Sequence, residues 1–116
     1  MSRELCEYLS VDEEKVARIK KALGVNDISN RMAEIFKVLC DPTRLRIAQA
    51  LESDELCVCD IAALMGLTQP SVSHHLKTLR QTGMVKYRKV GKMALYSLKD
   101  SHVSALLAVA RDHARE

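Results

Sequence analysis

Residues 64–79, LMGLTQPSVSHHLKTL, decide the fold of this chain. Gly66 can end one helix and Thr68 can cap the next. Pro70 then falls in the first turn of the second helix, where its missing amide proton costs nothing. Apolar residues repeat at helical spacing along that second helix, at Val72, Leu76 and Leu79. The pattern therefore predicts two short helices that meet at a tight turn.

The second of these helices turns a polar face outward. Its candidate contact residues carry amide, hydroxyl, imidazole and ammonium groups: Gln69, Ser71, Ser73, His74 and Lys77. Short side chains of mixed donor and acceptor character suit base edges in the DNA major groove, and a lysine suits phosphate. The stretch thus predicts a helix-turn-helix that reads DNA.

A β-hairpin is predicted after this helix. Residues 84–89 and 93–98 alternate apolar with polar, and Gly91 lies in the turn between them. A hairpin that follows a helix-turn-helix is a wing. Its cations are expected beside the groove, along the phosphates: Arg88, Lys89 and Lys92.

The remaining pattern is helical, so the fold class is a mainly α winged helix-turn-helix. Helices are expected at residues 12–23, 28–39, 42–51, 58–65 and 100–116. Phe36 is the only phenylalanine and is expected to anchor the core, with Met32, Ile35 and Leu39 on the same face. Cys40 is expected to pack beside them.

Length and composition indicate one domain, residues 1–116, with residues 1–11 as a flexible arm. The net charge of +3 is mild, but basic residues cluster between positions 77 and 92, which suits an anionic partner on one face. No apolar run approaches the roughly 18 residues of a membrane span, and no signal peptide opens the chain. We therefore expect a cytoplasmic protein whose four cysteines are reduced thiols.

The last helix carries a coiled-coil-like seam that favours a second helix as partner: Val103, Leu107, Ala110 and Ala114. His102 and His113 face the same way but lie roughly 16 Å apart, so one chain cannot close both on one ion. In an antiparallel pair, Asp100 and His102 of one chain would meet His113 and Glu116 of the other. Such N/O sites suit Zn(II) or Co(II). The alternative is a solvated helix with two surface histidines.

Cys57 and Cys59 form a second candidate metal site. Residues two apart point away from each other in a regular helix, so both sulfurs converge only where the backbone is not yet helical, as at a helix start. The amides and dipole there favour thiolate. Cys6 on the arm could add a third thiolate, giving a soft site for Cd(II), Pb(II) or a similar ion. The alternative is that Cys57 and Cys59 are small buried residues.

The sequence offers no nucleophile with a positioned base, no phosphate-cradling glycine loop and no paired catalytic carboxylates. We therefore expect that this protein is not an enzyme and that it binds no organic cofactor and no small organic substrate.

Four stretches of the sequence resemble the ArsR/SmtB family of metal-sensing repressors. They are LCDPTR at 39–44, ELCVCD at 55–60, VSHHL at 72–76, and Asp100-x-His102 with His113-x-x-Glu116. Within the family the chain is most similar to the CadC branch, which responds to cadmium, lead and zinc. The resemblance implies a homodimer, paired through its N- and C-terminal helices, that covers its operator without metal and releases it when metal binds.

The resemblance also implies two ligand sets. One is Cys57 and Cys59, completed by arm thiols, and the other is the interfacial set of Asp100, His102, His113 and Glu116. Ser10 stands where that branch has a second arm cysteine. Four thiolates would therefore become three, leaving a trigonal site or a fourth position for water or another oxygen. Trigonal sulfur suits Pb(II) better than Cd(II).

We therefore predict a homodimeric repressor of metal-efflux or detoxification genes, which binds a palindromic operator and is released by Cd, Pb or Zn. Two alternatives stay open. In a thiol redox switch, Cys57, Cys59 or Cys6 would oxidise and release DNA without metal. In a constitutive DNA-binding module, zinc would be only structural. The sequence leaves open which of the two metal sites controls DNA.

Overall fold

The computed structural model describes residues 10–116. It divides into two compact units, one ending at Arg31 and the other running from Met32 to Glu116. The predicted arm, with Cys6, lies almost wholly outside the described residues. Within the described part of the chain, no helix is long and apolar enough to cross a membrane.

The first unit contains helix α2 (Glu13–Leu23) and the start of α3 (Asn26–Leu39). The Asp12 carboxylate caps α2, because it accepts a hydrogen bond from the Lys15 amide at 3.0 Å. Gly24 follows the last residue of α2 with φ of +69°, a positive value that suits glycine. The predicted start and end of this helix are confirmed.

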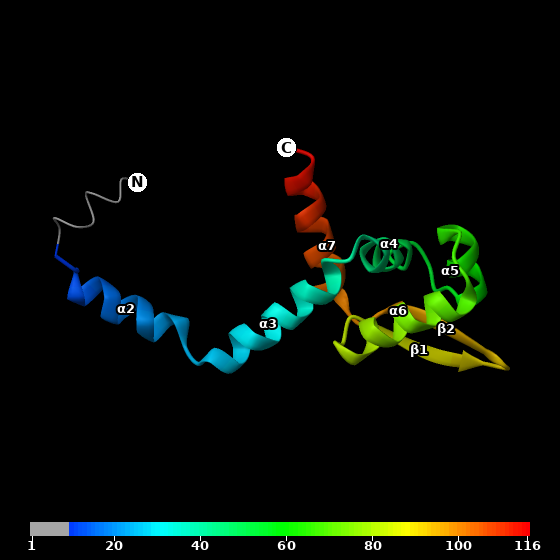
Figure 1. The fold of residues 1–116 in the computed structure, drawn as a ribbon, viewed down its shortest axis with the longest axis horizontal. Helices are drawn as coiled ribbons and strands as arrows, with labels where there is room; N and C mark the ends of the chain where they lie inside the picture. The colour runs from blue at the N-terminus through cyan, green and yellow to red at the C-terminus, as the bar shows by residue number, and fades with distance from the viewer. Residues whose placement is uncertain (1–9) are drawn as a thin grey trace. The chain divides into compact units, whose positions relative to one another are not determined.

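Three helices of the second unit pack against one another: α4 (Pro42–Ala50), α5 (Val58–Met65) and α6 (Gln69–Gln81) (Figure 1). The turn between α5 and α6 is as predicted. Gly66 is left-handed, with φ of +65°, and the Thr68 hydroxyl accepts a hydrogen bond from the Ser71 amide at 3.3 Å. The largest of the fully buried side chains come from all three helices and the first strand: Ile47, Ile61, Val72, Leu76, Leu79 and Val85.

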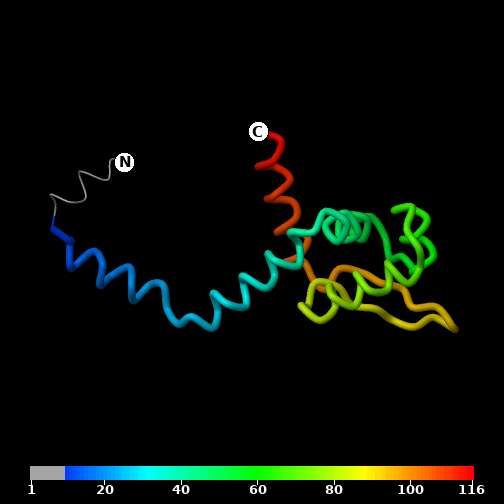
Figure 2. Tube along the Cα trace, in the orientation of Figure 1, coloured from blue at the N-terminus to red at the C-terminus, as the bar shows by residue number. Residues whose placement is uncertain are grey.

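The wing is an antiparallel hairpin of β1 (Val85–Val90) and β2 (Met93–Leu98), and it reverses in a tight turn visible in Figure 2. Gly91 occupies that turn with φ of +61°, which confirms the glycine-based prediction. Leu56, just before α5, exchanges two backbone hydrogen bonds with Tyr96 of β2, at 3.1 and 2.8 Å. The segment that leads into α5 is thereby attached to the wing.

Helix α7 (Ser101–Ala114) is capped by Asp100, whose carboxylate accepts hydrogen bonds from the amides of His102 and Val103. The predicted seam of this helix is partly wrong. Val103 and Leu107 are each only 4% exposed, because they pack into the core of their own chain, whereas Ala110 and Ala114 are exposed. Half of the seam is therefore already covered.

Two further expectations about the core are wrong. Phe36 is 54% exposed, and its neighbour Val38 is the buried residue of α3. Cys40 is exposed rather than packed. Ile35 and Leu39 of the same face do pack against the core, as expected, whereas Met32 and Phe36 are exposed. The phenylalanine therefore does not anchor the core of a single chain.

Candidate DNA interface and metal sites

The polar face of α6 lies as the helical spacing predicts. Gln69, Ser73, His74 and Lys77 are exposed, and Ser71 is half-buried in the first turn. Because the apolar face of α6 is completely buried, these side chains are held on one side of a rigid helix. Such a helix can enter a major groove with its N-terminal residues against base edges.

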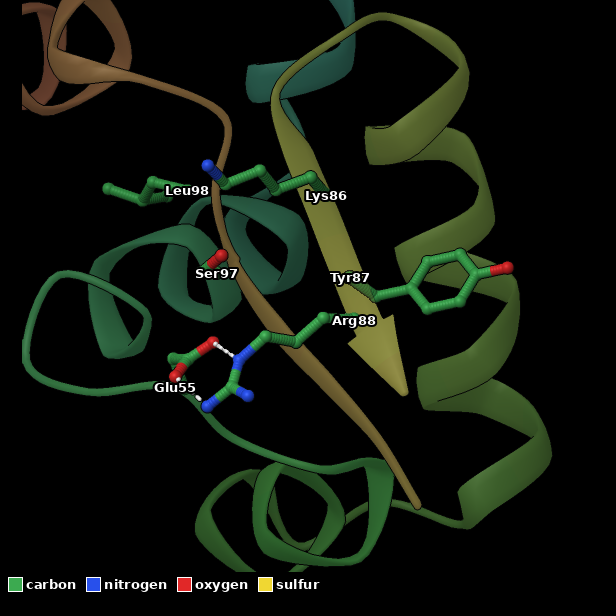
Figure 3. Close-up of a pocket in the computed structure, with 6 residues that line it drawn as sticks. All are labelled: Glu55, Lys86, Tyr87, Arg88, Ser97 and Leu98. Atoms are coloured by element: carbon green, nitrogen blue, oxygen red, sulfur yellow. Dashed lines mark hydrogen bonds and ion pairs between the residues drawn. The ribbon is translucent and has the colours of Figure 1, made fainter. Parts of the chain in front are cut away.

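The cations of the wing differ in what they contact. Lys89 and Lys92 are exposed, whereas the Arg88 guanidinium donates two hydrogen bonds to the Glu55 carboxylate, at 2.8 and 2.9 Å (Figure 3). Hydrogen bonding to Arg88 lowers the pKa of Glu55, and the same bonds raise the pKa of Arg88. The charge of Arg88 is thus balanced within the chain, and its contact with DNA stays a prediction.

Aromatic contacts join the reading helix to the wing. The Arg80 guanidinium of α6 lies over the ring of Tyr87 in β1, 5.2 Å from its centroid. Tyr87 in turn lies 5.4 Å from the ring of Tyr96 in β2. These residues fix the position of the wing beside α6, and their spacing in the sequence gave no signal of the contact.

The cysteine pair lies at a helix start, as predicted. Cys57 is the N-cap of α5 and has an extended backbone, with φ of −86° and ψ of 169°. Cys59 is exposed and Cys57 half-buried, which contradicts the alternative that both are buried packing residues. Both border one open cavity of about 310 Å³, together with Lys92 and Met93 at the tip of the wing.

Each of these sulfurs has a polar partner that the sequence analysis missed. Cys57 Sγ donates to Asp60 Oδ2 at 3.2 Å, and the same oxygen accepts the Cys57 amide at 3.4 Å. The three-residue spacing of Cys57 and Asp60 is typical of a capping box and could have signalled this contact. Cys59 Sγ accepts a hydrogen bond from Gln69 Nε2 at 3.3 Å. The second contact joins the cysteine pair to the DNA-reading helix.

The candidate ligands on α7 form one pair at each end of the helix. His102 Nδ1 lies 3.5 Å from Asp100 Oδ1, and His113 Nδ1 lies 3.4 Å from Glu116 Oε2. Asp100 uses the same oxygen to accept the amides of His102 and Val103, and both histidines are well exposed. Two imidazoles and two carboxylates form a donor set that fits Zn(II).

Neither ligand set is complete within the described part of one chain. Across residues 10–116, no three His, Cys, Asp or Glu side chains come together as a metal site. The predicted α7 set would need the opposite ends of two helices, and the predicted thiolate set would need Cys6. Among the residues that it describes, the structure shows only pairs of candidate ligands, and their role in metal binding stays a prediction.

The sequence profile of bacterial regulatory proteins of the arsR family matches residues 41–87. The chain is 44% identical to a transcriptional repressor SmtB homolog of Synechocystis sp., an alignment that covers 97% of this chain and 85% of that protein. The chain belongs to the ArsR family. It is also 43% identical to a cadmium resistance regulatory protein CadC homolog of Staphylococcus aureus, over 100% and 96% of the two chains.

This ArsR-family chain is a DNA-binding transcriptional regulator and not an enzyme, since that is the class of its relatives. Its fold is similar to a homodimeric winged helix-turn-helix DNA-binding domain from Mycobacterium bovis, with a TM-score of 0.74 and 28% identity over 77% of this chain and 82% of that chain. The family resemblance and the winged helix-turn-helix fold predicted from the sequence are both confirmed.

The matched segment begins at Asp41, which caps α4, and ends at Tyr87 in β1. It includes the cysteine pair and the whole of the reading helix, whereas α7 lies outside it. The similarity to the SmtB and CadC homologues extends over α7 as well.

Proposed function

We propose that this protein is a homodimeric repressor of metal-efflux or detoxification genes, which releases a palindromic operator when Cd(II), Pb(II) or Zn(II) binds. The observation that carries the proposal is the position of Cys57 and Cys59. Both border one cavity at the start of α5, the helix that packs directly against the reading helix. Relatives named for cadmium resistance support the choice of a thiophilic metal.

In the DNA-bound state, α6 would lie in the major groove and the wing beside it. Gln69, Ser71, Ser73 and His74 would face base edges, whereas Lys77, Lys89 and Lys92 would neutralise phosphates. A symmetric homodimer repeats this arrangement on two half-sites, which is why the operator should be palindromic. A regulator of this kind acts where the DNA is, so we place it in the cytoplasm.

Two ligand sets would hold metal. The thiolates of Cys57, Cys59 and Cys6 would form a soft site, and Asp100, His102, His113 and Glu116 would form N/O sites across the dimer. A bound cation holds its ligands in one arrangement. If that arrangement does not fit DNA, metal and DNA lower each other's affinity by the same factor.

The proposal is tested by measuring operator affinity by fluorescence anisotropy during titration with Cd(II), Pb(II) and Zn(II). The operator is first selected from random duplex DNA with the metal-free protein. We expect a loss of affinity of about 10- to 100-fold, typical of coupling between two sites, together with ultraviolet metal–thiolate absorption. Cys57→Ser should remove both effects with the thiophilic ions.

His102→Ala is the matched control variant for the second ligand set. If Cys57→Ser leaves metal-driven release intact while His102→Ala abolishes it, control belongs to α7 and not to the cysteines. Release by peroxide that thiols reverse and chelators do not affect would instead identify a redox switch. If removal of metal leaves operator affinity unchanged, the metal is only structural.

A further inference from the structure

The contact between Gln69 and Cys59 joins the candidate metal site to the DNA-reading face. Gln69 is the first residue of α6, and Cys59 lies in the first turn of α5. The side-chain amide nitrogen of Gln69 lies 3.3 Å from the sulfur, within hydrogen-bonding distance for a sulfur acceptor. Both residues are exposed, so DNA and metal can each reach one partner of this pair.

The state of the sulfur determines how strongly it holds this amide. A thiol both donates and accepts weakly, whereas a thiolate can only accept. A metal-bound sulfur keeps anionic character, and hydrogen bonds to charged acceptors are roughly twice as strong as neutral ones. A donor that hydrogen-bonds a metal ligand from outside in turn helps to orient that ligand. Metal on Cys59 would therefore hold the Gln69 amide firmly against α5.

DNA requires the same amide in another position. A glutamine reads adenine with two hydrogen bonds, one from its NH₂ group and one to its carbonyl oxygen. Residues at the N-terminus of a recognition helix are the ones that meet base edges, and Gln69 is the first of them. When its NH₂ group is turned toward Cys59, the side chain cannot present both groups to a base.

We propose that Gln69 is the positioning residue through which metal on Cys59 weakens DNA binding. The metal-bound thiolate captures the side-chain amide and withdraws it from the base that it reads. This inference rests on the proposed function, because it requires metal to bind at the cysteine pair. In addition, metal binding and DNA binding compete for the side chain of Gln69. Release of DNA would then need no large movement of α6.

Gln69→Met tests the proposal, because methionine keeps the length and helical preference of glutamine but has no amide. Gln81→Met is the matched control, an exposed glutamine at the other end of α6. Operator affinity is measured without metal and with saturating Cd(II), and the ratio of the two affinities gives the coupling. Ultraviolet absorption reports whether the cysteines still bind the ion.

We expect Gln69→Met to lower metal-free operator affinity about 5- to 150-fold, which corresponds to one lost bidentate base contact. The affinity ratio between metal-free and Cd(II)-loaded protein should fall by at least about fivefold, whereas the thiolate absorption at saturation stays. Gln81→Met should change none of these quantities.

Operator variants add a readout that a merely structural residue would not affect. The metal-free protein should discriminate against replacement of one adenine in each half-site. That discrimination should disappear both in Gln69→Met and in the unmodified protein loaded with Cd(II). A change of metal state would then have the same effect on base preference as removal of the amide.

Two results would overturn the proposal, and they differ. If Cd(II) binds the cysteines and releases DNA equally well from Gln69→Met and from the unmodified protein, Gln69 is not the coupling residue, while the proposed function stands. If none of Cd(II), Pb(II) and Zn(II) changes the DNA affinity of the unmodified protein, the proposed function and this inference both fail.

Discussion

Helices α6 and α3 carry the same kind of apolar repeat but bury it to different degrees. Val72, Leu76 and Leu79 of α6 are each 0% exposed, whereas Met32 and Phe36 of α3 are 50% and 54% exposed. Helices α4 and α5 and strand β1 pack against α6, so its own chain covers its apolar face. Helical spacing thus shows that a face needs cover, but it does not show which chain provides it.

The exposed face of α3 continues a wider pattern of uncovered apolar residues. Val16 and Ile19 of α2 are 50% and 49% exposed, and Ile28 of α3 is 55% exposed. Exposed apolar residues that repeat along two helices are typical of an interaction surface. In the proposed homodimer, the second copy would cover them. The apolar face of α6 is therefore expected to stabilise the fold of one chain, and the exposed face of α3 to stabilise the dimer. Mutations in each helix can separate these two effects.

The largest effect is expected from Leu76→Ala in α6. It removes a completely buried side chain and leaves a cavity, so the free energy of unfolding should fall by about 2–5 kcal/mol. Urea unfolding followed by circular dichroism measures the change. The loss should be the same at low and high protein concentration, because the contacts of Leu76 lie within one chain.

Ser73→Ala is the control for this measurement, an exposed substitution one turn earlier on the same helix. Its effect should stay within about 0.5 kcal/mol. If the loss caused by Leu76→Ala shrank markedly at high concentration, α6 would depend on a partner, and the contrast with α3 would fail.

A second prediction concerns Phe36→Ala in α3. Because Phe36 is half-exposed in one chain, its truncation should have little effect on the unfolding of the monomer. Burial of a phenylalanine at an interface contributes about 1.5–3 kcal/mol, so the dissociation constant of the dimer should rise by at least about tenfold. Sedimentation equilibrium over a range of concentrations measures it.

Leu64→Ala provides the matched control, since Leu64 is 60% exposed and lies on α5 rather than on α3. It should leave the dissociation constant unchanged. If the free energy of unfolding of monomeric Phe36→Ala is as low as that of Leu76→Ala, Phe36 belongs to the core and the prediction is wrong.

The features that were predicted correctly have local causes. Gly66, Thr68 and Gly91 each meet a backbone requirement set by their immediate neighbours, so the turn, the cap and the hairpin could be read directly. Phe36 and Cys40 were assigned wrongly because burial depends on what covers a residue, and helical spacing does not contain that information.

The candidate site shows the same division. Residue type and spacing identified Cys57 and Cys59 as candidate ligands, and their position at a helix start followed from the helix predicted at residues 58–65. The contact of Gln69 with Cys59 could not be foreseen, because it depends on how α5 and α6 pack. The ion pair of Glu55 and Arg88 joins residues 33 positions apart, which no local pattern reveals.

The smallest effect is expected from Glu55→Gln, which tests an exposed contact made within one chain. Because Arg88 lowers the pKa of Glu55 in the folded protein, the ionised carboxylate stabilises the fold. That contribution is complete above the ordinary value of 4.5 and is lost as the pH falls through the lower, folded value. The unmodified protein should therefore be slightly more stable than Glu55→Gln at neutral pH, and this difference should vanish in acid.

Urea unfolding between pH 7 and pH 3 measures this difference, with Glu34→Gln, an exposed carboxylate on α3, as control. Added salt should reduce it, because both side chains are partly exposed to solvent. It should not vary with protein concentration, since both partners belong to one chain. A difference that grew as the pH fell would mean that Arg88 does not favour the ionised form of Glu55. A dependence on concentration would place this pair, like the face of α3, among the features that a second copy completes.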